Sequence, residues 1–165
     1  MIADWNVFKA KHPNYREAFE QLCYLLFCGE HNIRTGIFRY KNQPGIETNP
    51  VEINGELVGF QAKFFDEKID KEQIKESIKK AKEDNPGLKK IYLYVYPEFS
   101  KKKGKKKPEI QEDIENFAKS LGIEIVWRVS SHIEFQLSQP ENRYLAEYYF
   151  SLGKSTYDCI VFYAR

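Results

Sequence analysis

The dipeptide Asn54-Gly55 is the feature that most constrains how this chain folds. Asn-Gly is the strongest short-range signal for a two-residue β-hairpin, because both central residues of that turn need positive φ angles. It predicts a hairpin over residues 45–65. A regular two-residue turn places Ile53 opposite Glu56, so the dipeptide predicts the strand register as well as the turn.

Amphipathic helices and short apolar strands alternate along the rest of the chain. In chain order we expect a helix over 14–29, the hairpin, a helix over 70–84, a strand over 91–96, a helix over 108–121, a strand over 123–127, a short helix over 133–137 and a last helix from Pro140 to Leu152. Helical connections between strands imply parallel neighbours. The order therefore predicts an α/β fold, with a central mixed sheet of four to five strands flanked by helices on both faces.

Residue types at the helix ends predict where two of these helices begin and where one of them ends. Asn14 with Glu17 has the form of a capping box, and Gly29 is expected to end the same helix. Ser131 with Glu134 repeats the capping-box pattern, so we expect a short helix there rather than a strand.

Length and composition indicate one globular domain. The chain has 165 residues, of which 42% are hydrophobic and 15% aromatic, enough to bury a core. We expect a single domain over residues 1–153 and a C-terminal tail over 154–165. The three cysteines form no CxxC pair, and no signal peptide or membrane-spanning run is visible, so we expect a cytoplasmic protein with reduced thiols and no membrane partner.

Positive charge is concentrated in one segment. The formal net charge is only +2, which does not by itself indicate a nucleic-acid-binding protein. Six lysines nevertheless lie within residues 101–107; they are Lys101, Lys102, Lys103, Lys105, Lys106 and Lys107. Clustered lysines bind phosphates because they release condensed counterions. We therefore expect these six residues either to contact nucleic acid or to form an ordinary solvated loop.

Three residues around the hairpin have the chemistry to hydrolyse a phosphodiester. Glu47 precedes the turn, and Gln61 and Lys63 follow it on the second strand. A carboxylate and an amide oxygen are hard ligands that suit Mg²⁺. A lysine beside them could orient the attacking water and balance developing negative charge.

Three short motifs lie along this part of the chain: Phe19-Glu20 in the first long helix, Gly45-Ile46-Glu47, and Gln61-x-Lys63. Together they resemble the motifs of the PD-(D/E)xK nuclease superfamily, and most closely its Mrr-type restriction endonuclease-like domains, in which glutamine replaces the second acidic residue. The resemblance covers about residues 14–127 and implies a restriction-endonuclease-like core. It also implies Mg²⁺ or Mn²⁺ as cofactor.

The resemblance assigns a role to each matching residue. Glu47 would be the principal metal carboxylate, Gln61 would offer its amide oxygen, and Ala62 could add its backbone carbonyl. Lys63 would position or help to deprotonate the water. Glu20 would reach in from the helix as an outer ligand or as a ligand of a second metal.

The hairpin register leaves the identity of the metal carboxylate open. In a regular hairpin Glu47 would lie opposite Ala62 and would point away from Lys63, unless a bulge at Pro50 turned it inward. Glu52 has the correct face but lies about 20 Å from Lys63 at ~3.3 Å per residue. We favour Glu47 and keep Glu52 as the alternative.

These patterns lead to one preferred function and two alternatives. The preferred one is a metal-dependent endonuclease that hydrolyses nucleic acid, expected to be DNA, in bacterial restriction or anti-phage defence. A catalytically inactive nuclease-fold module that binds nucleic acid is the second, and a non-catalytic interaction domain within a larger assembly is the third. Association with a larger defence protein is a further expectation from the resemblance. Since nuclease domains that cut both strands often work in pairs, a homodimer is also expected.

Overall fold

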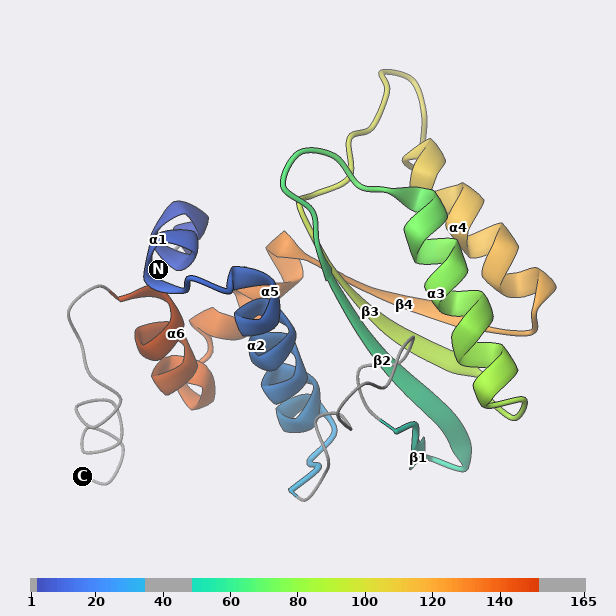
Figure 1. The fold of residues 1–165 in the computed structure, drawn as a ribbon, viewed down its shortest axis with the longest axis horizontal. Helices are drawn as coiled ribbons and strands as arrows, with labels where there is room; N and C mark the ends of the chain where they lie inside the picture. Colours follow the sequence, from blue (N-terminus) through green and yellow to red (C-terminus); the bar gives the residue numbers. More distant parts are fainter. Residues whose placement is uncertain (1–2, 35–48, 152–165) are drawn as a thin grey trace.

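The fold is a sheet covered by helices on both faces (Figure 1). The computed structural model describes residues 3–34 and 49–151. In chain order the elements are α1 (Trp5–Lys11), α2 (Tyr15–Glu30), β1 (Val51–Ile53), β2 (Glu56–Phe64), α3 (Lys71–Asp84), β3 (Lys90–Tyr96), α4 (Glu109–Ser120), β4 (Glu124–Val129), α5 (Ser130–Ser138), the 3₁₀ helix η1 (Pro140–Asn142) and α6 (Arg143–Phe150). This arrangement confirms the α/β class expected from the sequence.

The sheet is mixed and has the strand order β1-β2-β3-β4. β1 is antiparallel to β2, whereas β2, β3 and β4 run parallel. α3 connects β2 to β3 and α4 connects β3 to β4, as parallel neighbours require. The described residues supply four strands, the lower of the two predicted numbers.

The hairpin has the turn and the register that its sequence predicts. Asn54 has a φ of 52° and Gly55 a φ of 79°, the two positive angles of a type I′ turn. Ile53 lies opposite Glu56, as expected. The first strand begins only at Val51, and residues 45–48 of the predicted arm lie outside the described part of the chain.

Side chains alternate along β2 between two separate cores. Phe60, Ala62 and Phe64 are buried against α1, α2, α5 and α6 on one face of the sheet. Gln61 lies between them in sequence and faces α3 on the other side, where its amide donates to Ser77. This alternation is what a strand covered on both faces requires.

β3 alternates in the same way between the two cores. Ile91, Leu93 and Val95 are fully buried in the core beneath α3 and α4. Tyr94 points to the opposite core and is also fully buried. Its ring contacts that of Phe60 with centroids 5.5 Å apart, so this tyrosine packs the interior.

Helix α2 begins where the sequence predicts but ends later. The Asn14 side chain accepts a hydrogen bond from the backbone N–H of Glu17, which confirms the cap. The prediction that Gly29 ends the helix is wrong, because Asn32 takes the left-handed conformation with φ of 53°. The Ile33 N–H then donates to the Cys28 carbonyl (2.8 Å), which is the bond of a Schellman motif.

The short helix predicted after β4 is present, but its capping box is not. α5 begins at Ser130, so Ser131 lies inside the helix and cannot cap it. The Ser131 N–H instead donates to the Glu98 carboxylate (2.6 Å), from the loop that follows β3. A residue distant in sequence thus satisfies one of the exposed amides of the first helical turn.

The ends of the chain contain one helix that the sequence did not predict. α1 is capped by Asp4, whose carboxylate accepts from the backbone amides of Asn6 and Val7. At the other end α6 stops at Phe150, and the predicted tail over 154–165 lies outside the described residues. Within the described ranges, every helix is too short or too polar to cross a membrane.

Candidate functional site

β2 places Gln61 and Lys63 on the same face of the sheet, toward α3. They are two residues apart on one strand, so their side chains share a face. The Gln61 side chain is fully buried, and its Nε2 donates to the Ser77 carbonyl of α3 at 3.2 Å. Lys63 is only half-buried, near the carboxyl end of the strand. The structure therefore brings together two of the predicted catalytic residues.

Glu20 approaches this region from the other side of the sheet. It belongs to α2, which packs on the face occupied by Phe60. Tyr24, one turn later in the helix, contacts the Phe60 ring with centroids 5.6 Å apart, so this flank of α2 lies over β2. A half-buried Glu20 on that flank could meet Lys63 only around the edge of β2.

Of the two candidate metal carboxylates, Glu47 and Glu52, the structure describes only the second. Glu47 lies outside the described residues. Glu52 is exposed in β1 and lies opposite Leu57, six positions before Lys63 along β2. At ~3.3 Å per residue this separation is about 20 Å, too far for both groups to act on one phosphate. The observed register thus supports the reasoning that disfavoured Glu52.

The oxygen donors of this region suit a hard divalent cation in their chemistry. Amide, backbone and carboxylate oxygens are ligands that Mg²⁺ and Mn²⁺ accept. The Ala62 side chain is buried on the α2 face, so only its backbone carbonyl could serve, as the sequence implied. Among the described residues, no group of three or more His, Cys, Asp or Glu side chains is positioned to hold a metal. The predicted metal carboxylate, Glu47, is not one of these described residues.

The lysine-rich loop lies at the same end of the sheet as Lys63. β2 and β3 are parallel, and Lys63 lies opposite Val95 near the carboxyl end of both strands. The loop over residues 101–107 leaves β3 at this end and projects from the molecule (Figure 1). In open α/β sheets, ligands bind at the carboxyl ends of the strands. This carboxyl end of the parallel strands is the candidate functional site.

The six lysines fall into two groups. Lys102 and Lys105 pair with Glu109 of α4 at 2.9 and 3.9 Å, and Lys107 pairs with Glu115 at 2.5 Å. The hydrogen bond from Lys102 lowers the pKa of Glu109. The second group makes no ion pair within the described part of the chain; it consists of Lys101, Lys103 and Lys106.

A second polar cluster lies after the carboxyl end of β2. The Asp66 carboxylate accepts a hydrogen bond from the Tyr15 hydroxyl (2.7 Å) and pairs with Arg16 and with Lys9 (3.6 Å). The bond from Tyr15, helped by the two cations, lowers the pKa of Asp66. A pocket of about 730 Å³ opens beside it, with Lys68 on its wall. The sequence did not predict this cluster, because its members come from separate elements.

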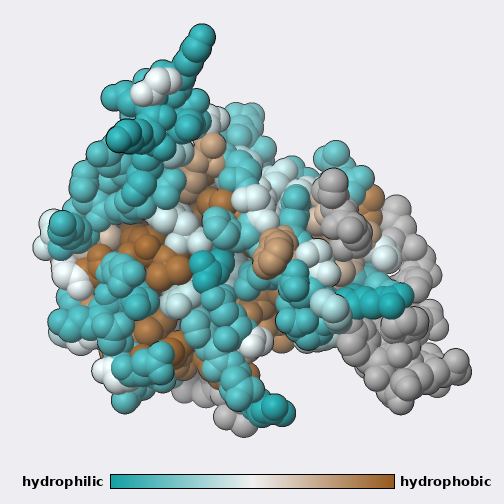
Figure 2. Space-filling model, turned by 180° about the vertical axis from the view of Figure 1, so that it is seen from behind, coloured by the Kyte–Doolittle hydropathy of each residue, from teal (hydrophilic) through white to brown (hydrophobic). Residues whose placement is uncertain are grey.

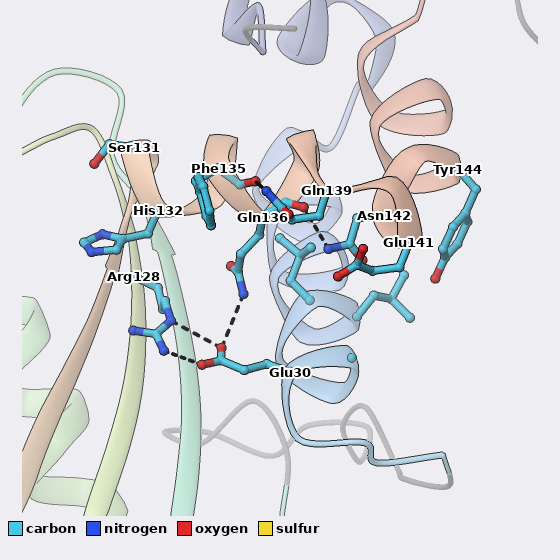
Figure 3. Close-up of a pocket in the computed structure, with 13 residues that line it drawn as sticks. Glu30, Arg128, Ser131, His132, Phe135, Gln136, Gln139, Glu141, Asn142 and Tyr144 are labelled. Atoms are coloured by element: carbon cyan, nitrogen blue, oxygen red, sulfur yellow. Dashed lines mark hydrogen bonds and ion pairs between the residues drawn. The ribbon is translucent and has the colours of Figure 1, made fainter.

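Another pocket lies on the face of the sheet that α2 covers, between α2, α5 and α6 (Figure 3). It measures about 710 Å³, and Phe135, 68% exposed, lines it. Glu30 extends from the end of α2 and bonds to both Arg128 and Gln136 (Figure 3). Because these polar side chains bond to one another, they support the packing of α2 against β4 and α5.

Comparison with models of known protein families gives no match for this chain, and comparison with curated protein sequences gives none either. The residues of the chain and their positions in the structure are therefore the basis for assigning a function.

Proposed function

We propose that this protein is a metal-dependent nuclease that hydrolyses phosphodiester bonds of nucleic acid, with DNA as the expected substrate. One observation carries the proposal. Because β2 and β3 run parallel, Lys63 and the lysine loop both lie at the carboxyl end of these strands. A substrate backbone bound by the loop would therefore lie at the end of the sheet where Lys63 is located.

The proposed roles follow from the chemistry of each group. Glu47, the Gln61 amide oxygen and the Ala62 carbonyl would hold Mg²⁺ or Mn²⁺, with Glu20 as an outer ligand. The bound cation would neutralise negative charge on the phosphate. The Lys63 ammonium would orient the attacking water and stabilise the charge that develops as the water displaces one ester oxygen.

The first test is the cleavage of supercoiled plasmid with Mg²⁺ or Mn²⁺ and with EDTA. Lys63→Met keeps the apolar stem of the side chain but removes its charge. We expect cleavage that needs the cation and that falls about 10²-fold or more in this variant, as on the loss of a charge-stabilising group. Lys79→Met is the matched control, because Lys79 is an exposed α3 lysine whose one ion pair among the described residues is with Glu83 (3.8 Å).

Two results would contradict the nuclease. One is the absence of cation-dependent cleavage in the wild-type protein. The other is a cleavage rate that Lys63→Met and Lys79→Met leave equally unchanged, since the activity would then come from elsewhere in the molecule or from a contaminant.

A non-catalytic module that binds nucleic acid is the second candidate. One observation favours it: Gln61 is fully buried and donates to the Ser77 carbonyl, as an ordinary structural residue would. The discriminating result is binding of duplex DNA that weakens with salt, without cleavage under any divalent cation. The cellular setting, a cytoplasmic restriction or anti-phage system in which the chain associates with a larger defence protein, rests on the family resemblance and belongs to the same proposal.

A further inference from the structure

β4 is the outermost strand of the sheet in the described ranges, and its outer edge faces no other described strand. The Glu124 N–H donates to the Lys89 carbonyl at 2.9 Å, so the peptide groups of Glu124 point toward β3. Successive residues of a strand turn their peptide groups to opposite sides, so those of Ile125 and Trp127 point outward. Such an edge can pair with a further strand.

The composition of β4 favours pairing. Ile125, Val126 and Trp127 are consecutive, half-buried residues of types that prefer strands. Figure 2 views the molecule from behind Figure 1, from the side on which β4 lies, and shows apolar surface exposed between hydrophilic areas. A hollow of about 570 Å³ beside Ile125, bordered by Lys119 of α4, leaves room for incoming side chains.

We propose that two copies of this chain associate by antiparallel pairing of their β4 strands, about a two-fold axis through Val126. The sequence of β4 is self-complementary in this register. Glu124 of each copy lies opposite Arg128 of the other, so the dimer gains two pairs of opposite charge on one face. Ile125 lies opposite Trp127, and these are the residues whose peptide groups face outward.

Hydrogen-bond geometry is consistent with this register. In antiparallel strands, residues that exchange both N–H···O bonds alternate with residues that exchange none. Ile125 and Trp127 would exchange both bonds, on each side of a central pair formed by Val126 and its symmetry mate. A shift by one residue would oppose outward-facing groups with inward-facing ones, so it is excluded.

Arg128 can take part without losing its present contacts. Its Nε and Nη2 bond to Glu30, and its Nη1 donates to the Trp127 carbonyl at 3.0 Å. A guanidinium has five N–H groups, so two remain for Glu124 of the second copy. The Trp127 carbonyl has a second lone pair that can accept the N–H of Ile125 from that copy.

A cysteine at the axis tests the register directly. The central pair exchanges no hydrogen bonds, so its Cα atoms would lie about 4.5 Å apart, within the ~4.4–6.8 Å range of disulfides. Val126→Cys is made with Cys28→Ser and Cys159→Ser, whereas Cys23 stays because it is buried. We expect diamide to convert this variant into a covalent dimer.

Glu124→Cys in the same background is the matched control. Residue 124 would lie opposite residue 128 of the second copy and not opposite itself, so we expect little cross-linking. Equal cross-linking of the two variants would overturn the register, and a Val126→Cys variant that remains uncross-linked would overturn the interface.

Sedimentation of the unmodified protein tests the association itself. Ile125→Pro removes an outward N–H, and edge strands tolerate proline at such positions because the β3 side of the ladder is untouched. We expect a dimer for the wild-type protein and a monomer for the variant, with circular dichroism confirming that the variant is folded. A monomeric wild-type protein, or a dimer that survives Ile125→Pro, would refute the proposal. If the variant does not fold, the two cysteine variants decide.

Discussion

At the residue scale, the two conspicuous polar groups of β2 differ in their surroundings. Gln61 is fully buried and hydrogen-bonded to the backbone of α3, whereas Lys63 is half-buried near the strand end. A buried amide stabilises the fold through its hydrogen bond and can still offer an oxygen to a cation. Variants at position 61 can separate these two contributions.

Gln61→Glu is expected to lower the stability of the metal-free protein and to increase the stabilisation that Mn²⁺ provides. The new carboxylate cannot donate to the Ser77 carbonyl, and a buried group left unpaired costs about 1–3 kcal/mol. If residue 61 ligates the metal, the added charge should tighten binding, so Mn²⁺ should raise the melting temperature more than in wild type. Thermal unfolding with and without Mn²⁺ measures this, and an equal rise in both proteins would remove Gln61 from the ligand set.

Two half-buried histidines should make stability depend on pH. Burial lowers the pKa of His12 and His31 below the unfolded value of about 6.5. The unfolded state therefore binds more protons, so the free energy of unfolding falls as pH decreases through about 6.5 and levels off below the folded pKa values. Urea unfolding between pH 7.5 and about 5 measures the slope. Replacing both histidines by Asn should flatten it; an unchanged slope would show that other groups are responsible.

At the scale of elements, the helix ends show how local signals compete. Asn14, Asp70 and Gly122 occupy the terminal positions that their residue types favour. At the end of α2, both Gly29 and Asn32 have the residue type that ends helices, and only the second adopts a positive φ. The choice depends on where the helix stops packing against the sheet, which the local sequence does not state.

Substitutions at these two positions test which residue ends α2. Gly29→Ala should stabilise the protein by roughly 0.5–1 kcal/mol, because Gly29 is helical and an added Cβ meets no atom within 4 Å. Asn32→Ala should destabilise it by about 1 kcal/mol, because the left-handed conformation is costly for alanine. Chemical denaturation gives both values. Destabilisation by Gly29→Ala would place the end of the helix at residue 29 after all.

At the scale of the whole molecule, charge is distributed unevenly over a nearly neutral protein. The loop lysines that pair with α4 are held by carboxylates, whereas Lys101, Lys103 and Lys106 make no such pair among the described residues. Phosphates must compete with Glu109 and Glu115 for the first group but not for the second. The two groups should therefore contribute differently to binding.

Replacing each group of three lysines by serine tests this difference. The triple variant of Lys101, Lys103 and Lys106 should bind duplex DNA more weakly, with a salt slope reduced by up to about 3. The matched variant, which replaces the lysines paired with α4, carries the same change of charge and should lose less. Fluorescence anisotropy over a range of salt concentrations measures both. Equal slopes for wild type and both variants would remove the loop from the binding surface.

The proposed dimer also has a consequence for cleavage. Antiparallel pairing of β4 turns the carboxyl ends of the two sheets in opposite directions, so the two candidate sites would not face one duplex together. We therefore expect nicked circles to accumulate before linear plasmid. Linear product without a nicked precursor would contradict the combination of this dimer with this site.

The sequence by itself determined what depends on neighbouring residues. The Asn54-Gly55 turn, the alternation of side chains along β2 and the apolar stripes of the helices are local features. Strand and helix periods fix which side chains share a face. These features were sufficient to predict the α/β class and to place Gln61 and Lys63 together.

Only the tertiary structure decided what depends on residues distant in sequence. It buried Gln61 against α3, gave α5 a cap from Glu98, divided the loop lysines between α4 and solvent, and placed β4 at the edge of the sheet. Each of these outcomes follows from how separate elements pack, and packing depends on the whole chain and not on any one segment of it.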